Sequence, residues 1–123
     1  MKLPVIFSVL AAFASLSANA AEVRGARVNA NDATLQVDIS YGGGCGNKSF
    51  KLEVSPEWAY TSPTQGTARI IESGFDACEA IVSKTLSFSL KAEGLARPSL
   101  RAATLTIYGE DDSSAEVTLP YEL

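Results

Sequence analysis

The strongest constraint on the fold is a strict alternation of apolar and polar side chains in one stretch of the chain. In residues 34–41 every second residue is polar, and the others are Leu35, Val37, Ile39 and Tyr41. A period of two residues places each set on one face of an extended strand. Such a strand is typical of an antiparallel sheet that packs one face on a core and exposes the other to water.

Similar short runs occur along the rest of the chain. The runs that we expect to form strands are residues 22–29, 34–41, 50–54, 67–72, 79–90, 102–108 and 115–121. Turn-forming residues separate them, and no stretch outside the first 20 residues indicates a long helix. About seven strands of this kind predict an all-β fold, a single immunoglobulin-like antiparallel β-sandwich. A small barrel is the alternative.

Three local features of the sequence predict details of this fold. Adjacent apolar residues at Ile81 and Val82 interrupt the pattern of their strand and predict a β-bulge. Pro120 has no backbone N–H to donate, so the last strand is expected at a sheet edge. Residues 91–99 contain a glycine and a proline and are expected to form a connection with one helical turn.

The first 20 residues have the features of a secretory signal peptide. Lys2 precedes an apolar stretch over residues 3–16, and Ala18-Asn19-Ala20 is a small-residue cleavage site. The apolar stretch is shorter than the ~20 residues of a spanning helix, so we expect no membrane insertion after cleavage. The predicted division is a signal peptide over residues 1–20 and a β-sandwich domain over residues 21–123, in the periplasm or the medium.

The charge of the chain limits its partners. The formal net charge of the 123 residues is −4, and loss of Lys2 with the signal peptide makes it −5. An acidic domain without a basic stripe argues against nucleic acid and against anionic membrane surfaces as partners.

The chain contains only two cysteines, Cys45 and Cys78. In an exported protein such a pair favours a disulfide. The bridge would close a loop of 34 residues, which contributes roughly 3–4 kcal/mol in the loop-entropy account. Two free thiols or a thiolate metal pair are the alternatives, although the chain has no histidine to complete a zinc site.

Catalysis has little support in the sequence. The absence of histidine excludes Ser-His and Cys-His pairs, and nothing local selects a Ser-Lys pair or a carboxylate pair. Residues 110–112 lack the spacing of a calcium loop and suit a solvated hairpin tip. Residues 42–44 suit a tight turn rather than a phosphate cradle, because no helix follows. We therefore expect no catalytic residue, no metal and no cofactor.

The candidate binding residues are Trp58 and Tyr60, which lie in the long irregular stretch over residues 55–66. Large amphipathic aromatic rings favour recognition surfaces. The alternative is that Trp58, the only tryptophan of the chain, closes one end of the sandwich.

Residues 43–52 and 76–80 resemble two motifs of small exported bacterial proteins and lipoproteins. Those proteins have Gly-Gly-Cys-x-x-His-x-Phe-x-Leu, and later Asp-x-Cys-x-Ala followed by Leu-x-Phe-x-Leu, which residues 86–90 match. Lys48 stands where the motif has histidine, so no role of that histidine is carried over. The resemblance covers about the middle half of the domain and implies export and a bridge between Cys45 and Cys78. It implies no ligand.

Together these features predict a non-enzymatic periplasmic or secreted module that binds another envelope or extracellular protein. One alternative is a structural subunit of a surface assembly, since chaperone–usher pilins are similar exported domains with a disulfide. The other is a protease inhibitor. Residues 62–66 and 97–98 resemble loops of chagasin-like inhibitors, although the loop order differs and the tryptophan after the proline is missing.

Overall fold

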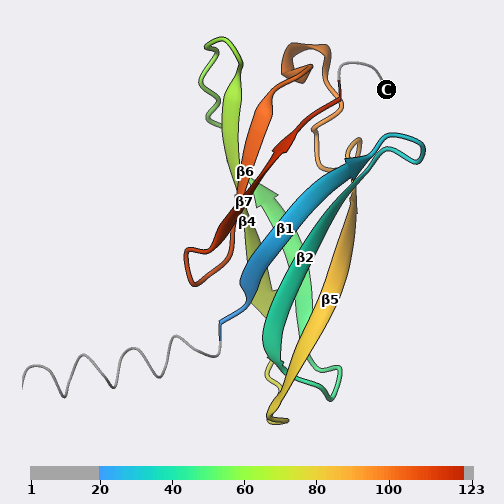
Figure 1. Cartoon of the computed structure of the whole chain (residues 1–123), viewed down its shortest axis with the longest axis vertical. Helices are drawn as coiled ribbons and strands as arrows, with labels where there is room; N and C mark the ends of the chain where they lie inside the picture. Colours follow the sequence, from blue (N-terminus) through green and yellow to red (C-terminus); the bar gives the residue numbers. More distant parts are fainter. Residues whose placement is uncertain (1–19, 121–123) are drawn as a thin grey trace, which may run out of the picture.

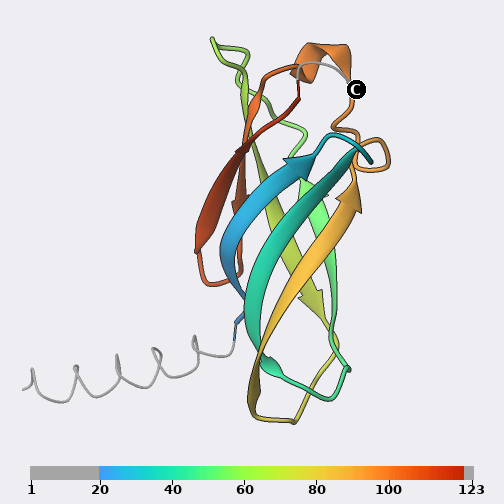
Figure 2. The same cartoon turned by 45° about the vertical axis from the view of Figure 1, so that its right-hand side comes forward.

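The computed structural model describes residues 20–120, and its strands form two sheets packed face to face (Figures 1 and 2). The strands are β1 (Glu22–Asn29), β2 (Thr34–Gly43), β3 (Ser49–Val54), β4 (Gln65–Ser73), β5 (Ala80–Ser89), β6 (Thr104–Tyr108) and β7 (Ser114–Thr118). One sheet has the order β1-β2-β5 and the other β3-β4-β6-β7. The predicted seven-stranded β-sandwich is confirmed. Residues 1–19 of the predicted signal peptide, and Tyr121 of the predicted last strand, lie outside the described residues.

The hydrophobic core fills the space between the two sheets. The alternation in β2 is confirmed, because its four apolar side chains are all buried. From the other sheet, Ile70, Leu105 and Ile107 are buried to the same degree. Each buried aliphatic side chain of this size contributes about 1.5–3 kcal/mol relative to exposure. The described residues include no buried polar or charged residue.

One pair of neighbouring strands departs from the antiparallel prediction, because β4 and β6 run parallel. The order of the chain explains this. After β4 the chain crosses to the other sheet, forms β5 in the opposite direction, and returns to add β6 beside β4 (Figure 1). Two reversals restore the original direction, so the strands align in parallel.

The bulge predicted at Ile81 and Val82 is wrong. The ladder between β2 and β5 is continuous, with Tyr41 opposite Val82 and Gly42 opposite Ile81. The register shift found in this sheet lies instead in β1, between Val23 and Gly25. The two adjacent apolar residues of β5 thus point to opposite faces of the sheet.

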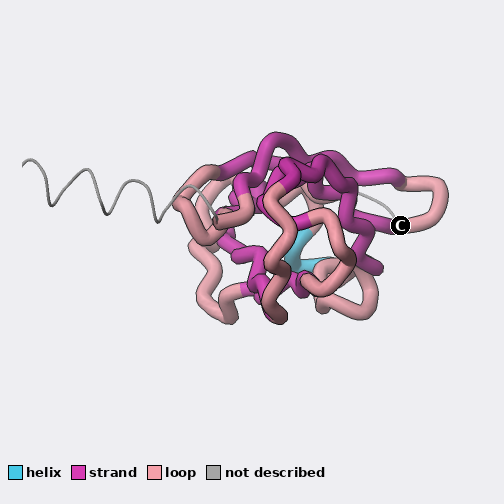
Figure 3. The backbone as a smooth tube through the Cα atoms, turned by 90° about the horizontal axis from the view of Figure 1, so that it is seen from below, coloured by secondary structure: helices cyan, strands magenta, loops and turns pink. Residues whose placement is uncertain are grey.

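The connections gather at the two ends of the sandwich (Figure 1). The loops of residues 44–48 and 74–79 lie at the lower end, where they join β2 to β3 and β4 to β5. The loop of residues 55–64 and the connection of residues 90–103 lie at the upper end. That connection contains a 3-10 turn, η1 (Pro98–Leu100), seen in cyan in Figure 3, in the region where one helical turn is predicted. The last strand, β7, lies at a sheet edge as Pro120 predicts.

Candidate functional site

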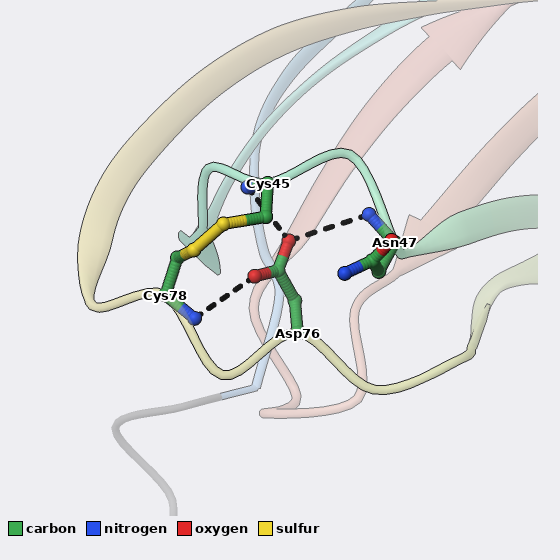
Figure 4. The surroundings of a disulfide bond; sticks show 4 residues. All are labelled: Cys45, Asn47, Asp76 and Cys78. Atoms are coloured by element: carbon green, nitrogen blue, oxygen red, sulfur yellow. Dashed lines mark hydrogen bonds between the residues drawn. A yellow bond between two sulfur atoms is a disulfide. The ribbon is translucent and has the colours of Figure 1, made fainter.

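A disulfide between Cys45 and Cys78 closes the lower end of the sandwich (Figure 4). The two Cα atoms are 5.9 Å apart, a usual separation for such a bridge. Cys45 follows β2 and Cys78 precedes β5, so the bridge joins two of the three connections that cross between the sheets. The predicted pairing of the two cysteines is confirmed.

The carboxylate of Asp76 braces both sides of this disulfide (Figure 4). Its Oδ2 accepts hydrogen bonds from the backbone N–H groups of Cys45 at 3.0 Å and Asn47 at 3.4 Å. Its Oδ1 accepts one from the N–H of Cys78 at 3.0 Å. Desolvation raises the pKa of Asp76. The hydrogen bonds from these three N–H groups and from the N–H of Gly44 together lower the pKa by more than desolvation raises it, so it lies below the ordinary 3.8. The carboxylate is therefore ionised at neutral pH, the state in which it accepts these bonds best.

Two glycines permit this arrangement. A Cβ on Gly43 would lie 2.9 Å from Oδ2 of Asp76, and Gly44 has a φ of +116°, where side chains are strongly disfavoured. The glycine run therefore forms a tight turn that brings Cys45 and its N–H to the bridge and to the carboxylate.

Cys45, Asp76 and Cys78 are also the one cluster of three potential metal ligands found within residues 20–120, with ligand atoms within 4.8 Å of one another. The two sulfur atoms are bonded to each other, and the carboxylate oxygens already accept backbone hydrogen bonds. A thiolate metal site requires free sulfur ligands. The arrangement is that of a braced disulfide.

Lys48, the last residue of the loop of residues 44–48, forms a largely buried ion pair with Glu72 of β4. Its Nζ is 3.0 Å from Oε1 of Glu72, and the two side chains are only 13% and 12% exposed. The ammonium also lies 5.7 Å from the ring centre of Tyr41, a favourable cation–π distance. Tyr41 in turn packs edge-on against Phe50. Lys48, which directly precedes β3, thus contacts residues of both β4 and β2.

The structure separates the roles of the two candidate binding residues, Trp58 and Tyr60. Trp58 is half-buried and packs against the margin of the core. Its ring covers Gly66, where a Cβ would meet ring carbons at 2.4 Å. Tyr60, two residues later, is 66% exposed. Their loop lies at the upper end of the sandwich, opposite the disulfide (Figure 1).

Trp58 also forms one wall of a cleft of about 660 Å³ on the outer side of the sheet β3-β4-β6-β7. The floor consists of outward side chains of β4, β6 and β7. They include Thr67, Thr104, Thr106, Tyr108 and Glu116. Tyr60 lies outside this lining. Hydroxyl groups and carboxylates dominate the cleft, so its surface is mainly polar.

A second surface was not anticipated from the sequence. Phe75 is 80% exposed and Ile81 is 76% exposed, and both line a cleft of about 510 Å³ beside the disulfide. Lys48 and Glu79 line it as well. The sequence held a signal for this surface in the broken alternation at Ile81, which we interpreted as a bulge. The interruption instead marks an apolar side chain that faces solvent.

Asp38, on the outer face of the sheet β1-β2-β5, has an evident structural role. Thr85 donates a hydrogen bond to it at 2.7 Å, and Arg27 forms an ion pair with it at 2.8 Å. The hydrogen bond from Thr85 has the largest effect, and together with Arg27 it lowers the pKa of Asp38 below the ordinary 3.8. Asp38 thus links all three strands of its sheet.

Comparisons with protein families, with curated proteins and with solved structures found no match to this chain. No helix among residues 20–120 has the length and apolar character needed to cross a membrane. The surfaces and contacts of the domain itself are therefore the guide to its function.

Proposed function

We propose that the chain is an exported, non-enzymatic module with an immunoglobulin-like β-sandwich, which binds another protein in the periplasm or outside the cell. The disulfide supports export, because such bonds persist in oxidising compartments. The acidic charge of −4 for the whole chain supports a protein partner rather than a nucleic acid.

The observation that carries this proposal is the pair of exposed apolar side chains at the disulfide end, Phe75 and Ile81. Leaving large apolar groups in water forgoes the free energy of burying them, so a concentrated exposed pair is a feature of interaction surfaces. The disulfide and Asp76 brace the loop that carries Phe75. A loop ordered before binding loses less conformational entropy when the complex forms.

The loop with Trp58 and Tyr60 remains a second candidate surface. Tyr60 offers a free ring with a hydrogen-bonding hydroxyl. Trp58 is less suited to be the main anchor, because much of its ring already packs on Gly66 and the core margin. Partner binding is therefore assigned first to Phe75 and Ile81.

Variant-dependent capture from envelope extract tests this assignment. We expect the native chain to capture a partner saturably, and a Phe75→Ser, Ile81→Ser variant to lose it. A Tyr60→Ser variant, altered at the opposite end, should retain the partner. If only Tyr60→Ser lost the partner, the binding surface would lie on the loop of residues 55–64 instead. The absence of any saturable partner would refute the binding module.

A structural subunit is the second candidate, and one observation favours it. β5 is the outer strand of its sheet, 10 residues long, with no strand beside its free edge among the described residues. Such an edge can accept a strand of another chain. Polymers that grow with concentration in size-exclusion chromatography would support this candidate over the binding module.

A further inference from the structure

The first residue after the predicted cleavage site, Ala21, is part of the folded domain. It is 1% exposed and belongs to the buried core. Its backbone nitrogen donates a hydrogen bond to Oε2 of Glu72 at 3.0 Å. Its carbonyl oxygen lies so close to Gly109 that a Cβ there would approach it to 2.7 Å. Two residues on, the N–H of Val23 donates to Oγ of Ser113 at 2.7 Å.

The acceptor, Glu72, is a largely buried carboxylate with two oxygens directed at different partners. Oε1 faces the ammonium of Lys48 at 3.0 Å, and Oε2 faces the nitrogen of Ala21. Its own backbone N–H donates to Glu110 at 3.3 Å. The titratable and charged groups around this corner are Glu22 and Arg24 of β1, Tyr41 of β2, Lys48 before β3, Arg69 and Glu72 of β4, and Glu110, Asp111 and Asp112 of the β6–β7 turn. Carboxylates outnumber cations among them.

We propose that cleavage after Ala20 generates an α-ammonium group on Ala21 that Glu72 captures, so that processing completes a largely buried Lys48–Glu72–Ala21 ion cluster. This inference rests on the proposed export of the chain. Hydrolysis of the Ala20–Ala21 peptide bond by one water molecule leaves a carboxylate on Ala20 and an amine on Ala21, which takes up a proton at neutral pH. The site for that cation is already present in the position of Oε2.

The physical gain is the replacement of a neutral N–H donor by a charged one. Hydrogen bonds between ions are shorter and about twice as strong as those between neutral groups. The surrounding carboxylates favour a second cation beside Lys48, and the low exposure of Glu72 limits solvent screening. The ordered α-amine is then expected to hold its proton well above pH 8.

The test uses the processed protein purified after export by a bacterial host, with its N-terminus identified by intact mass. Competitive acetylation at a series of pH values, read from the tryptic peptide of residues 21–24, reports the pKa of the α-amine. In the folded protein we expect this pKa to lie about one to two units above the ordinary 7.7–8.0. In denaturing urea the same amine should return to the ordinary range, a comparison that needs no variant.

A Glu72→Gln variant supplies the second measurement, with Glu116→Gln on the exposed outer face of β7 as the matched control. We expect Glu72→Gln to remove the rise in pKa and the control to keep it. An ordinary pKa in the folded native protein, or an unchanged rise in Glu72→Gln, would refute the ion cluster. An exported chain with another N-terminus would also refute it while leaving export intact. A chain that is not exported would refute the proposed function itself.

Discussion

At the scale of single residues, the position of the Trp58 ring depends on the lack of a side chain at Gly66. The indole ring occupies the space that any Cβ on residue 66 would need. The sheet accepts a glycine here, although glycine weakens strands, because the ring replaces the missing side chain. Trp58 thereby closes the margin of the core at the upper end.

We expect Gly66→Ala to destabilise the fold by about 1–3 kcal/mol, because the added methyl group must displace the ring of Trp58. Urea unfolding followed by tryptophan fluorescence measures this change. Gly25→Ala is the matched control in β1, since its Cβ would meet only Asp38 at an ordinary 3.6 Å. That substitution should leave stability unchanged or raise it by up to about 1 kcal/mol. Equal effects of the two substitutions would contradict the packing argument.

Asp76 makes a pH-dependent contribution to stability. Its pKa in the folded state is lowered below 3.8, so the stabilisation is fully present above the ordinary pKa. It is lost as pH falls through the lower, folded-state value. We therefore expect the native protein to lose stability in acid more steeply than Asp76→Asn, measured by urea unfolding between neutral pH and pH ~2. The control is Glu53→Gln, on the exposed side of β3, whose stability should vary with pH as that of the native protein does. If the stability of Asp76→Asn fell with pH in parallel with the native protein, the carboxylate would not stabilise the loop.

At the scale of elements, β5 has no strand beside its outer edge within residues 20–120, and it carries a charge in an unusual position. Lys84 lies opposite the buried Ile39, in the row of side chains that faces the core. Its neighbours in that row, Val82 and Leu86, are half-buried and buried, whereas Lys84 is exposed. An inward charge on an edge strand obstructs pairing with another chain, because pairing would desolvate it.

We therefore expect Lys84→Val to promote association through β5, seen as concentration-dependent dimers or polymers in sedimentation experiments. Lys51→Val on β3 removes the same charge from an exposed strand position and should leave the native association state unchanged. A native chain that already polymerises would contradict this role of Lys84 and favour the structural subunit. A Lys84→Val chain that stays monomeric would show that the edge is closed by other means.

At the scale of the whole molecule, the disulfide connects two loops that cross from one sheet to the other. The loops it joins carry the chain from β2 to β3 and from β4 to β5. The domain is small, so its core alone provides a modest margin of stability. A cross-link between two of the three crossings removes conformational freedom from the unfolded chain over the 34 residues that it encloses.

Substitution of both cysteines, Cys45→Ser with Cys78→Ser, should lower the free energy of unfolding by roughly 3–4 kcal/mol. The far-ultraviolet circular dichroism spectrum should keep its β character if the variant folds, because the core is unchanged. Urea unfolding of the native protein, oxidised and chemically reduced, provides the comparison without substitution. Two reactive thiols in the native exported protein, or unchanged stability after reduction, would contradict this account.

Much of the fold was predictable because its signals are local. The alternation around Leu35 and Val37 determined a strand and its buried face, and turn residues determined where most strands stop. The presence of only two cysteines favoured their pairing. These features depend on neighbours in sequence or on residue counts, so they can be recognised without knowledge of the packing.

The candidate site was predictable only in part, because exposure depends on what packs nearby. The sequence selected Trp58 and Tyr60 by residue type, but could not show that the ring of Trp58 packs on a glycine while the ring of Tyr60 is exposed. It contained the irregularity at Ile81, but a bulge and an exposed apolar side chain produce the same pattern. Phe75 lies between two of the predicted strands, and only the arrangement of the crossing loops leaves it in solvent.

By itself, the sequence determined an all-β domain and the buried face of its clearest strand, and it favoured one cross-link. Only the tertiary structure decided that β6 lies parallel to β4, since that choice depends on how often the chain crosses between the sheets. It also decided that Glu72 meets Ala21, 51 residues away in sequence. Local preferences act between neighbours along the chain, whereas these contacts arise from the joint packing of both sheets, which no single segment encodes.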